Sequence, residues 1–293
     1  MANTLFIGKV YHRFDQLPST NDHAAELIAK STPPEGTVIR AASQTAGRGQ
    51  FGSRWESAAG KNLTLSVILY PDWLEAGAQF HLSMATALAL HDTVYSIVQN
   101  LPDESLLKAG EPSPVYRLPS TVHRPPSTVH RPPSTVHRPP STVKIKWPND
   151  LYLGDRKAAG ILIQNSLSGA HLQSSILGIG LNVNQTEFDP SLPNPGSLAS
   201  AYGRLFDLER VADTLLECLE RRYLQLKAGQ RQEIRADYEG RLYRLDTPAQ
   251  FARRDGSVFT GTVRGVSTDG RLRVEKESGE TEIFDLKEIR FLQ

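Results

Sequence analysis

A proline-rich repeat divides the sequence into two unequal parts. From Arg117 to Lys144 the chain reads RLPSTVH, RPPSTVH, RPPSTVH and RPPSTVK. The paired prolines exclude a helix interior, because proline lacks the backbone N–H and clashes with the preceding turn. The seven-residue period therefore does not indicate a coiled coil. Any folded domain must be built from the segments on either side of this repeat.

The repeat itself gives little sign of a function. Its histidines, His123, His130 and His137, recur on an extended chain with no second type of metal ligand nearby, which argues against a zinc site. A docking peptide in the polyproline-II conformation is the alternative. We predict a disordered loop over about residues 101–143, enlarged by tandem duplication. The entropic cost of closing a loop grows only logarithmically with its length, so the fold would tolerate it.

Composition narrows the class of protein. Lys and Arg number 33 against 32 for Asp and Glu, so the chain as a whole has little attraction for nucleic acid or anionic membranes. The single cysteine, Cys218, excludes an intramolecular disulfide framework and a thiolate zinc site. No secretory signal or membrane-spanning run is present in the sequence. We predict a cytoplasmic protein with no DNA or membrane partner.

Apolar periodicity predicts alternating helices and strands up to about residue 240. The expected helices are Ser19–Lys30, 79–98 and Asp207–Leu226, and the expected strands are Thr37–Ser43, Asn62–Tyr70, 143–147, 158–164 and 174–183. From about Leu242 short alternating strands are separated by turns at Asp255, Asp269 and Ser278, each followed by glycine. We therefore predict two domains, residues 1–240 and a small all-β domain of residues 241–293.

The segment Gln44–Ser57, QTAGRGQFGSRWES, is the first candidate site. Gly47, Gly49 and Gly52 allow positive φ angles, so that backbone N–H groups converge on an anion. Arg48 and Arg54 add charge suited to phosphate or carboxylate. The alternative is a flexible turn with solvated arginines.

The segment KIKWPNDLYLGDRKAAGIL, residues 144–162, is the most specific candidate. We expect a strand carrying Lys146, a turn containing Asn149 and Asp150, and a hairpin that places Lys157 on the next strand. Two lysines around an Asn-Asp turn suit a nucleotide phosphate and an attacking carboxylate. The alternative is a hairpin with a solvated basic edge.

A third segment, GIGLNVNQ from Gly178 to Gln185, has glycines where another group must approach the strand closely. Asn182 at its end is suited to hydrogen-bond a base or a ribose. A core strand that ends in a polar turn would explain the same residues.

Together these segments, with STND at Ser19–Asp22, resemble the biotin–protein ligases, also called biotin–[acetyl-CoA carboxylase] ligases. The resemblance extends over Leu5 to about Leu226, and the C-terminal strands are similar to the family's SH3-like barrel. It implies an α+β fold in which helices flank a mixed β-sheet, as in class II synthetases.

The resemblance implies a two-step reaction. The biotin carboxylate attacks the α-phosphorus of MgATP to give biotinyl-5′-AMP and pyrophosphate. A lysine of a biotin carboxyl carrier protein then attacks the mixed anhydride and releases AMP. The expected ligands are biotin, ATP and Mg²⁺, and the protein is expected to be a monomer or a homodimer.

The resemblance also implies roles for single residues. Lys157 would bridge the biotin carboxylate and the α-phosphate, Arg48 would close over the intermediate, and Asp150 would either accept the proton of the incoming lysine or hold Mg²⁺. The expected biotin-binding residues are Ser19, Thr20, Asn21, Gln44, Gly47, Arg48, Gly49, Lys157, Gly160 and Leu162. The expected adenylate-binding residues are Gly49, Gln50, Arg54, Trp55, Lys146, Asn149, Lys157 and Asn182.

One departure from the family pattern concerns charge. Gln50 and Ser53 stand where the family usually has arginine, and we expect Arg54 to compensate in part. The alternative functions are a lipoate– or octanoate–protein ligase of the same fold, a non-catalytic biotin-sensing protein, and a biotin-operon repressor. A repressor requires an N-terminal DNA-binding domain, and STND begins already at Ser19, so none is expected.

Overall fold

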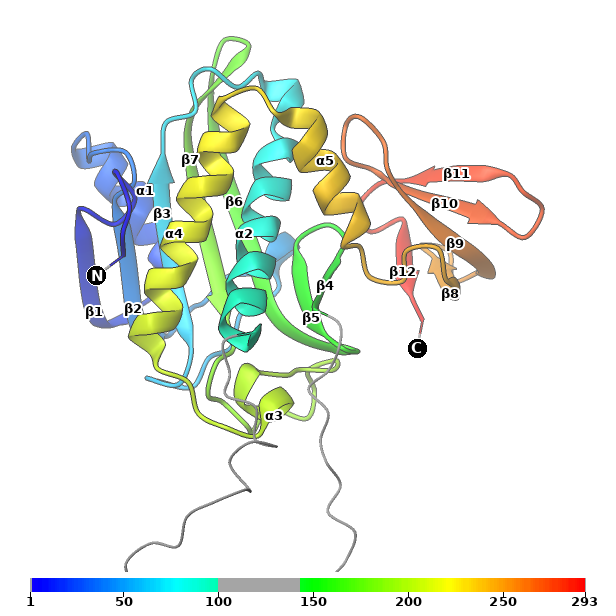
Figure 1. Ribbon diagram of the computed structural model, residues 1–293, viewed down its shortest axis with the longest axis horizontal. Helices are drawn as coiled ribbons and strands as arrows, with labels where there is room; N and C mark the ends of the chain where they lie inside the picture. The colour runs from blue at the N-terminus through cyan, green and yellow to red at the C-terminus, as the bar shows by residue number, and fades with distance from the viewer. Residues whose placement is uncertain (1, 100–142, 293) are drawn as a thin grey trace, which may run out of the picture.

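The structure, a computed structural model, describes residues 2–99 and 143–292. The predicted repeat loop lies outside the described residues, except for Val143, which begins a strand. Figure 1 shows a main body of sheet and helices with a second, smaller sheet at its side.

The main body contains a mixed seven-stranded sheet in the order β1-β2-β3-β7-β6-β5-β4. Strands β1 and β2 are parallel and every other neighbouring pair is antiparallel, which confirms the predicted mixed sheet. The strands are β1 Tyr11–Leu17, β2 Val38–Gln44, β3 Leu63–Leu69, β4 Val143–Lys146, β5 Asp150–Leu153, β6 Arg156–Ser168 and β7 His171–Leu181.

Helices cover the two faces of this sheet unequally. On β3, Leu65 and Val67 belong to the large core under α2 (Phe80–Gln99), α4 (Leu208–Lys227) and α5 (Arg231–Gly240), whereas Ile68 packs with Ala24 of α1 (Thr20–Lys30). Alternate residues of a strand point to opposite faces, so α1 lies on the other face from α2 and α4 (Figure 1). The shorter helix α3, Leu198–Tyr202, follows β7. The single helix α1 leaves part of its face open for a site.

The predicted elements are confirmed apart from several details. Helix α1 begins after its N-cap Ser19, whose side chain accepts a hydrogen bond from the backbone N–H of Asp22. The predicted turn position of Asp150 is wrong, because this residue begins β5 and pairs with Lys146 of β4. The predictions also missed β1 and α5, whose residues are mostly polar on the exposed side.

The C-terminal residues form a five-stranded antiparallel sheet in the order β11-β10-β9-β8-β12, which is consistent with an SH3-like barrel. Gly256, Gly270 and Gly279 have positive φ angles, as expected for the predicted turns. The strands are β8 Pro248–Arg253, β9 Val258–Val266, β10 Leu272–Lys276, β11 Thr281–Phe284 and β12 Ile289–Phe291.

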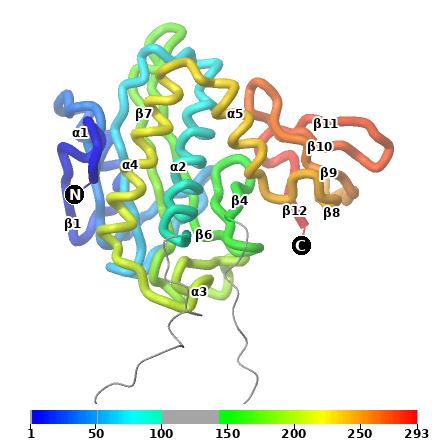
Figure 2. The backbone as a smooth tube through the Cα atoms, viewed as in Figure 1, coloured from blue at the N-terminus to red at the C-terminus, as the bar shows by residue number. Residues whose placement is uncertain are grey.

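Direct contacts fix the small sheet to the main body. The indole Nε1 of Trp147 donates to the carbonyl of Gly270 at 2.8 Å, and the N–H of Val266 on β9 donates to Oε1 of Glu239 on α5 at 3.0 Å. The chain passes directly from α5 into the small sheet and returns in β12 toward β4 (Figure 2). The C-terminal strand is thereby held beside the face that α1 leaves open.

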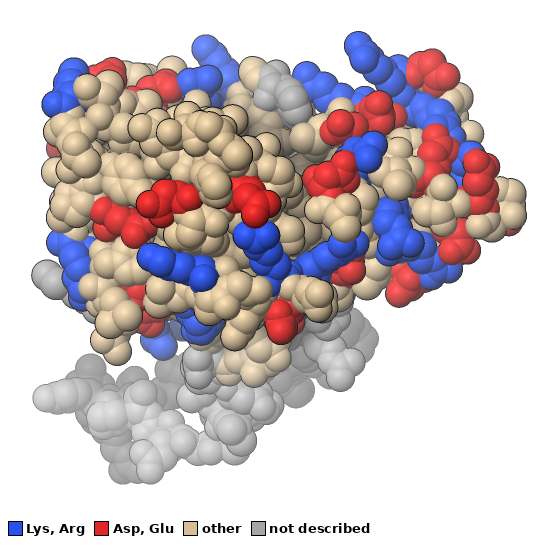
Figure 3. All heavy atoms as spheres, turned by 90° about the horizontal axis from the view of Figure 1, so that it is seen from above, with Lys and Arg blue, Asp and Glu red and all other residues tan. Residues whose placement is uncertain are grey.

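Charges of both signs are mixed over the small sheet (Figure 3). They form local ion pairs, such as that of Arg264 with Asp246 and Glu275. In the part of the chain that the structure describes, no helix combines the length and apolar character needed to cross a membrane.

Candidate active site

A cavity of about 350 Å³ opens on the sheet face that carries α1. Its walls come from the start of α1, the glycine-rich loop after β2, the strands β4 to β7 and the C-terminal segment Leu286–Phe291. Every predicted site residue except Gly47 and Asn182 lines it. The structure therefore brings together segments that lie far apart in the sequence.

One end of the cavity is a hydrogen-bonded polar cluster. The backbone N–H of Thr20 donates to Oε1 of Gln44 at 2.7 Å, and the hydroxyl of Ser66 donates to Oδ1 of Asn21 at 2.6 Å. Nδ2 of Asn21 donates to the carbonyl of Leu162 at 3.3 Å. Asn21 thus fixes α1 on the sheet, because both ends of its side-chain amide are engaged.

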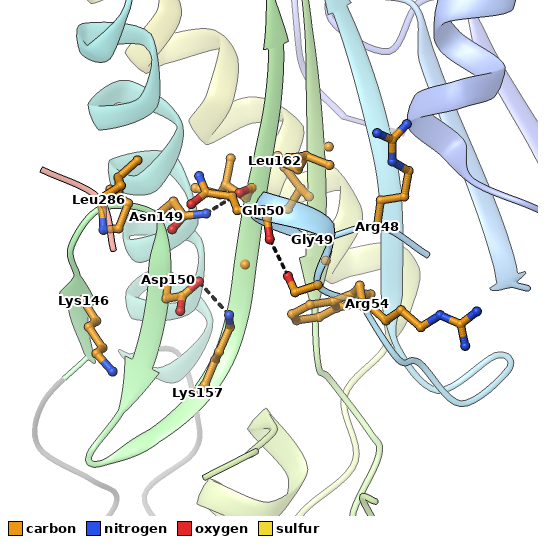
Figure 4. A pocket seen from close by; sticks show the side chains of 18 of the residues that line it. Arg48, Gly49, Gln50, Arg54, Lys146, Asn149, Asp150, Lys157, Leu162 and Leu286 are labelled. Carbon is orange, nitrogen blue, oxygen red and sulfur yellow. Dashed lines mark hydrogen bonds and ion pairs between the residues drawn. The ribbon is translucent and has the colours of Figure 1, made fainter. Parts of the chain in front are cut away.

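Lys157 lies at the middle of the cavity. Its Nζ is 2.8 Å from Oδ1 of Asp150 and 5.9 Å from the centre of the Trp55 ring (Figure 4). Asp150 on β5 faces Gly160 on β6 in the strand register. About a third of the Lys157 side chain remains exposed, so the ammonium is accessible from the cavity.

The indole of Trp55 lies directly on the sheet. A Cβ atom on Gly180 would lie 2.3 Å from the Trp55 ring, and one on Gly160 would lie 3.1 Å from it. A Cβ atom on Gly178 would lie 2.2 Å from Oδ1 of Asn21. The predicted close approach to the glycine strand is therefore made by side chains of the protein itself.

The glycine-rich loop folds as a tight hairpin. The N–H of Gly49 donates to the carbonyl of Ser53 at 2.7 Å, and the N–H of Trp55 donates to the carbonyl of Gly47 at 3.0 Å. The expectation of positive φ holds for Gly52 but is wrong for Gly47 and Gly49. At these two positions only glycine fits, since a Cβ atom on either residue would lie 2.4 Å from an atom on the opposite side of the hairpin.

The two arginines of this loop do not face Lys157. Arg48 forms an ion pair with Asp22 at 2.6 Å, and both Arg48 and Arg54 point away from Lys157 in Figure 4. Arg48 thus ties the hairpin to the first turn of α1. In this arrangement the loop contributes backbone, Gln50 and Trp55 to the cavity rather than guanidinium groups next to Lys157.

The opposite wall carries a second lysine. Nζ of Lys146 donates to the hydroxyl of Tyr152 at 3.0 Å, and the Phe291 ring centre lies 5.2 Å away. Burial lowers the pKa of Lys146 below its ordinary value. Asn149 is buried, and its Nδ2 donates to the carbonyl of Ile161, so its amide joins β5 to β6.

Sequence reasoning missed the contribution of the C-terminal sheet. Leu286, Lys287, Ile289, Arg290 and Phe291 line the cavity. The local sequence LKEIRF shows only a basic strand, and nothing in it indicates that the strand returns to the seven-stranded sheet. Gly178 and Gly180, which the sequence marked as a place of close approach, also line the cavity, and their spacing places both on one face of the strand.

Asn182 lines a second cavity, of about 220 Å³, beside the first. The two cavities share Ser53, Arg54, Trp55 and Lys157, so Trp55 forms the partition between them. Nδ2 of Asn182 donates to the carbonyl of Gly196 at 3.0 Å. Its Oδ1 is buried and has no hydrogen-bond partner among the described residues.

The described residues contain no group of three or more His, Cys, Asp or Glu side chains that would hold a metal ion. Asp150 is the one carboxylate among the cavity-lining residues, and it is paired with Lys157. These residues fit a metal ion that arrives with a polyphosphate better than one held by the protein alone.

Two family comparisons cover much of the chain. Residues 13–182 match the Biotin/lipoate A/B protein ligase family, and residues 250–286 match the Biotin protein ligase C terminal domain. The Bifunctional ligase/repressor BirA of Bacillus subtilis is 29% identical over 279 residues, which are 94% of this chain and 71% of that protein. The Biotin--[acetyl-CoA-carboxylase] ligase of Paracoccus denitrificans is 28% identical over 268 residues, 90% of this chain and 94% of the relative.

Solved structures show the same fold. The biotin protein ligase from Aquifex aeolicus in complex with biotin and ATP has a TM-score of 0.69 at 21% identity, covering 97% of this chain and 99% of that one. The Leishmania major biotin protein ligase in complex with biotin has a TM-score of 0.57 at 20% identity, covering 94% of this chain and 98% of that chain. The sequence match over residues 13–182 spans more than half of the chain. The chain therefore belongs to the Biotin/lipoate A/B protein ligase family and is a ligase.

Proposed function

We propose that this ligase is an ATP-dependent biotin–protein ligase. It activates biotin to biotinyl-5′-AMP and transfers biotin to a lysine of a biotin carboxyl carrier protein. The observation that carries the proposal is the position of Lys157, an accessible ammonium between a polar pocket at α1 and a second cavity at Asn182.

The first step joins two anions, the biotin carboxylate and the α-phosphate of ATP. Their repulsion is reduced where a cation lies between them, and the partly enclosed cavity strengthens this interaction relative to water. We assign the position between the two anions to Lys157, and Lys146 adds positive charge on the opposite wall. The leaving pyrophosphate carries away negative charge, with Mg²⁺ bound to the nucleotide.

The polar end of the cavity suits the ureido ring of biotin. Thr20 and Gln44 offer hydroxyl and amide groups there, next to Gly160 and Leu162 of β6. Asn21 and Trp55 cover the glycines of β7, so the bicyclic ring would lie against these side chains and not on the sheet itself. The same wall would place the valeryl chain of biotin toward Lys157.

The second cavity suits the adenine base. Its walls include the apolar side chains of Phe188, Leu192 and Pro195, beside the indole of Trp55. A flat aromatic base buries its faces against such walls, and stacking on an aromatic ring stabilises it further. We therefore assign this cavity to the adenine of ATP.

In the second step the amine of the carrier lysine must lose a proton. Asp150 lines the cavity beside Lys157 and is its one lining carboxylate among the described residues. We assign it the role of proton acceptor, because residues 2–99 and 143–292 place no further carboxylate beside it with which it would form a metal site.

The named relatives support the choice of acyl group and partner. The relative from Mycobacterium tuberculosis, 27% identical over 270 residues, is likewise named a biotin--[acetyl-CoA-carboxylase] ligase. We therefore propose the carrier domain of acetyl-CoA carboxylase, or of a related carboxylase, as the partner, and the cytoplasm as the compartment.

The direct test mixes the purified protein with ATP, Mg²⁺, biotin and an apo carrier domain. We expect AMP, pyrophosphate and a carrier whose mass increases by one biotinyl group. A carrier with Arg in place of its target lysine is the matched control, and lipoate is the competing acid. Transfer of lipoate but not biotin would show that the protein is a lipoate ligase.

A further inference from the structure

The side chain of Lys146 is a half-buried cation that makes no ion pair with the residues that the structure describes. Among the described residues, no carboxylate oxygen lies within 4.0 Å of its ammonium, and the nearby Asp150 is paired with Lys157 instead. Its hydrogen bond goes to the neutral hydroxyl of Tyr152. A cation in this state favours an anion that enters the cavity, because the anion supplies the missing opposite charge.

Two aromatic rings hold this ammonium in place. The ring centre of Tyr152, on β5, lies 4.9 Å from Nζ, and that of Phe291, on β12, lies 5.2 Å from it. Both distances are within the range of cation–π attraction. Phe291 is itself packed against Phe251 at 5.0 Å between ring centres. The ammonium is therefore bound jointly by the catalytic sheet and by the C-terminal sheet.

The backbone beside Lys146 is hydrogen-bonded to the segment that connects α5 to β8. The N–H of Ile145 donates to the carbonyl of Arg241 at 2.9 Å, and the N–H of Tyr243 donates to the carbonyl of Ile145 at 2.8 Å. The Tyr243 ring lies 5.2 Å from that of Tyr152 and 6.1 Å from that of Phe291. A displacement of β12 would therefore move the Phe291 ring relative to a lysine whose backbone is fixed.

We propose that Phe291 is a positioning residue, through which the C-terminal sheet holds the charged Lys146 ammonium at the cavity wall to receive a phosphate group of the nucleotide. The identity of the nucleotide rests on the proposed function. The positioning itself rests on the ring, the ammonium and the cavity that both of them line.

The test measures binding of inorganic pyrophosphate and of ATP by calorimetry, without biotin or carrier. Phe291→Leu keeps an apolar side chain but removes the ring, and we expect it to weaken pyrophosphate binding about three- to tenfold. Phe291→Tyr keeps the ring and should bind nearly as the wild type does. Phe259→Leu is the matched control, because Phe259 carries a similar contact with Arg253, at 4.6 Å, away from the cavity.

A double-mutant cycle separates positioning from general packing. Lys146→Met removes the ammonium, and in that background Phe291→Leu should cause no further loss of pyrophosphate binding. A pH series adds a second readout. The charged groups around Lys146 are Asp150, Lys157 and Arg244, and Tyr152 is its hydrogen-bond partner. Loss of the Phe291 ring disfavours the charged ammonium, so binding should decline at a lower pH than in the wild type.

Three results would overturn the proposal: wild-type binding by Phe291→Leu, an equal loss in the Lys146→Met background, or the same loss in Phe259→Leu. If Phe291→Leu fails to fold in a thermal unfolding experiment, Phe291→Met provides the same comparison. The proposed function can fail separately. A protein that binds pyrophosphate as described but forms no biotinyl-5′-AMP would refute biotin ligation while leaving the Phe291 result standing.

Discussion

The ammonium of Lys157 lies 2.8 Å from Oδ1 of Asp150. Lys157 lines both the first cavity, whose polar end lies at α1, and the second cavity at Asn182. The pair joins neighbouring strands, β6 and β5, and both side chains remain partly exposed. A substrate carboxylate or phosphate that enters the cavity can therefore compete with Asp150 for the ammonium. This exchange would also free the Asp150 carboxylate for the second step.

Lys157→Ala should reduce biotin-dependent pyrophosphate release by at least about 100-fold, because the two reacting anions lose the cation between them. Pyrophosphate release in a coupled assay measures this step alone. Lys144→Ala is the matched control, since Lys144 lies on β4 of the same sheet but does not line the cavity. Robust pyrophosphate release by Lys157→Ala would contradict the role given to Lys157.

Asp150→Asn should slow transfer from preformed biotinyl-5′-AMP to the carrier by about 100-fold, while adenylate formation changes much less. The amide keeps the shape of the side chain but does not accept a proton. Single-turnover experiments separate the two steps. If the variant instead needs much more Mg²⁺ for adenylate formation, Asp150 acts on the metal ion and not as the proton acceptor.

Gly180→Ala should destabilise the protein by about 1–3 kcal/mol, because the new methyl group overlaps the Trp55 ring. Urea denaturation measures the free energy of unfolding. Gly77→Ala is the control, since no atom lies within 4 Å of its added Cβ. Replacing Trp55 by Ala in the Gly180→Ala variant should remove the clash, and equal penalties in both backgrounds would show that no such contact exists.

Arg54→Ala should increase the rate at which biotinyl-5′-AMP leaves the protein, if Arg54 compensates for the family arginines replaced by Gln50 and Ser53. The argument is electrostatic, because Arg54 lines both cavities and the adenylate is an anion. Release is measured by chasing labelled adenylate with unlabelled adenylate, with Arg254→Ala on the C-terminal sheet as control. Unchanged release and transfer would refute the compensation.

The contacts of Asp92 predict a loss of stability in acid. Burial alone would raise its pKa, but the nearby imidazole of His91 and the hydrogen bond from Arg222 outweigh burial and hold the pKa well below its ordinary value of 3.8. A carboxyl group with a depressed folded-state pKa stabilises the protein above 3.8, and this contribution is lost as the pH falls toward the folded-state value.

Asp92→Asn tests this directly. It should cost about 2 kcal/mol at pH 7, because the buried guanidinium of Arg222 loses one of its two charged partners, at 2.8 Å, and keeps Asp237. Between pH 7 and pH 3 the wild type should lose more of its free energy of unfolding than the variant does. Parallel loss in the two proteins would show that Asp92 does not cause the acid sensitivity.

The fold was predictable where local sequence and tertiary structure favour the same conformation. Ser19 caps α1 through its own side chain, and the mostly apolar run Leu63–Leu69 forms a strand that is buried on both faces. The polar strand β1 was missed, because it pairs with β2 in parallel and the helix α1 lies between the two strands in the sequence. Such a pairing leaves no turn signal in the sequence.

The residues of the candidate site also divide into those that local sequence indicates and those that only tertiary packing brings to the site. Lys157, Asp150 and the glycine strand could be found in the sequence, because an unusual order of lysine, proline and glycine marks a hairpin with functional side chains. By contrast, the direction of Arg48 toward Asp22 and the buried contact of Trp55 with Gly180 depend on how a surface loop packs against the sheet. Local residue patterns carry no information about that packing.

The sequence alone therefore determined the helices α1, α2 and α4, most strands and the chemical groups of the site, since these depend on neighbours within a few residues. Only the tertiary structure decided that β12 returns to the cavity and places Phe291 beside Lys146. That contact joins residues separated by most of the C-terminal half of the chain. It exists because the contacts of Trp147 with Gly270 and of Glu239 with Val266 hold the small sheet against the main body.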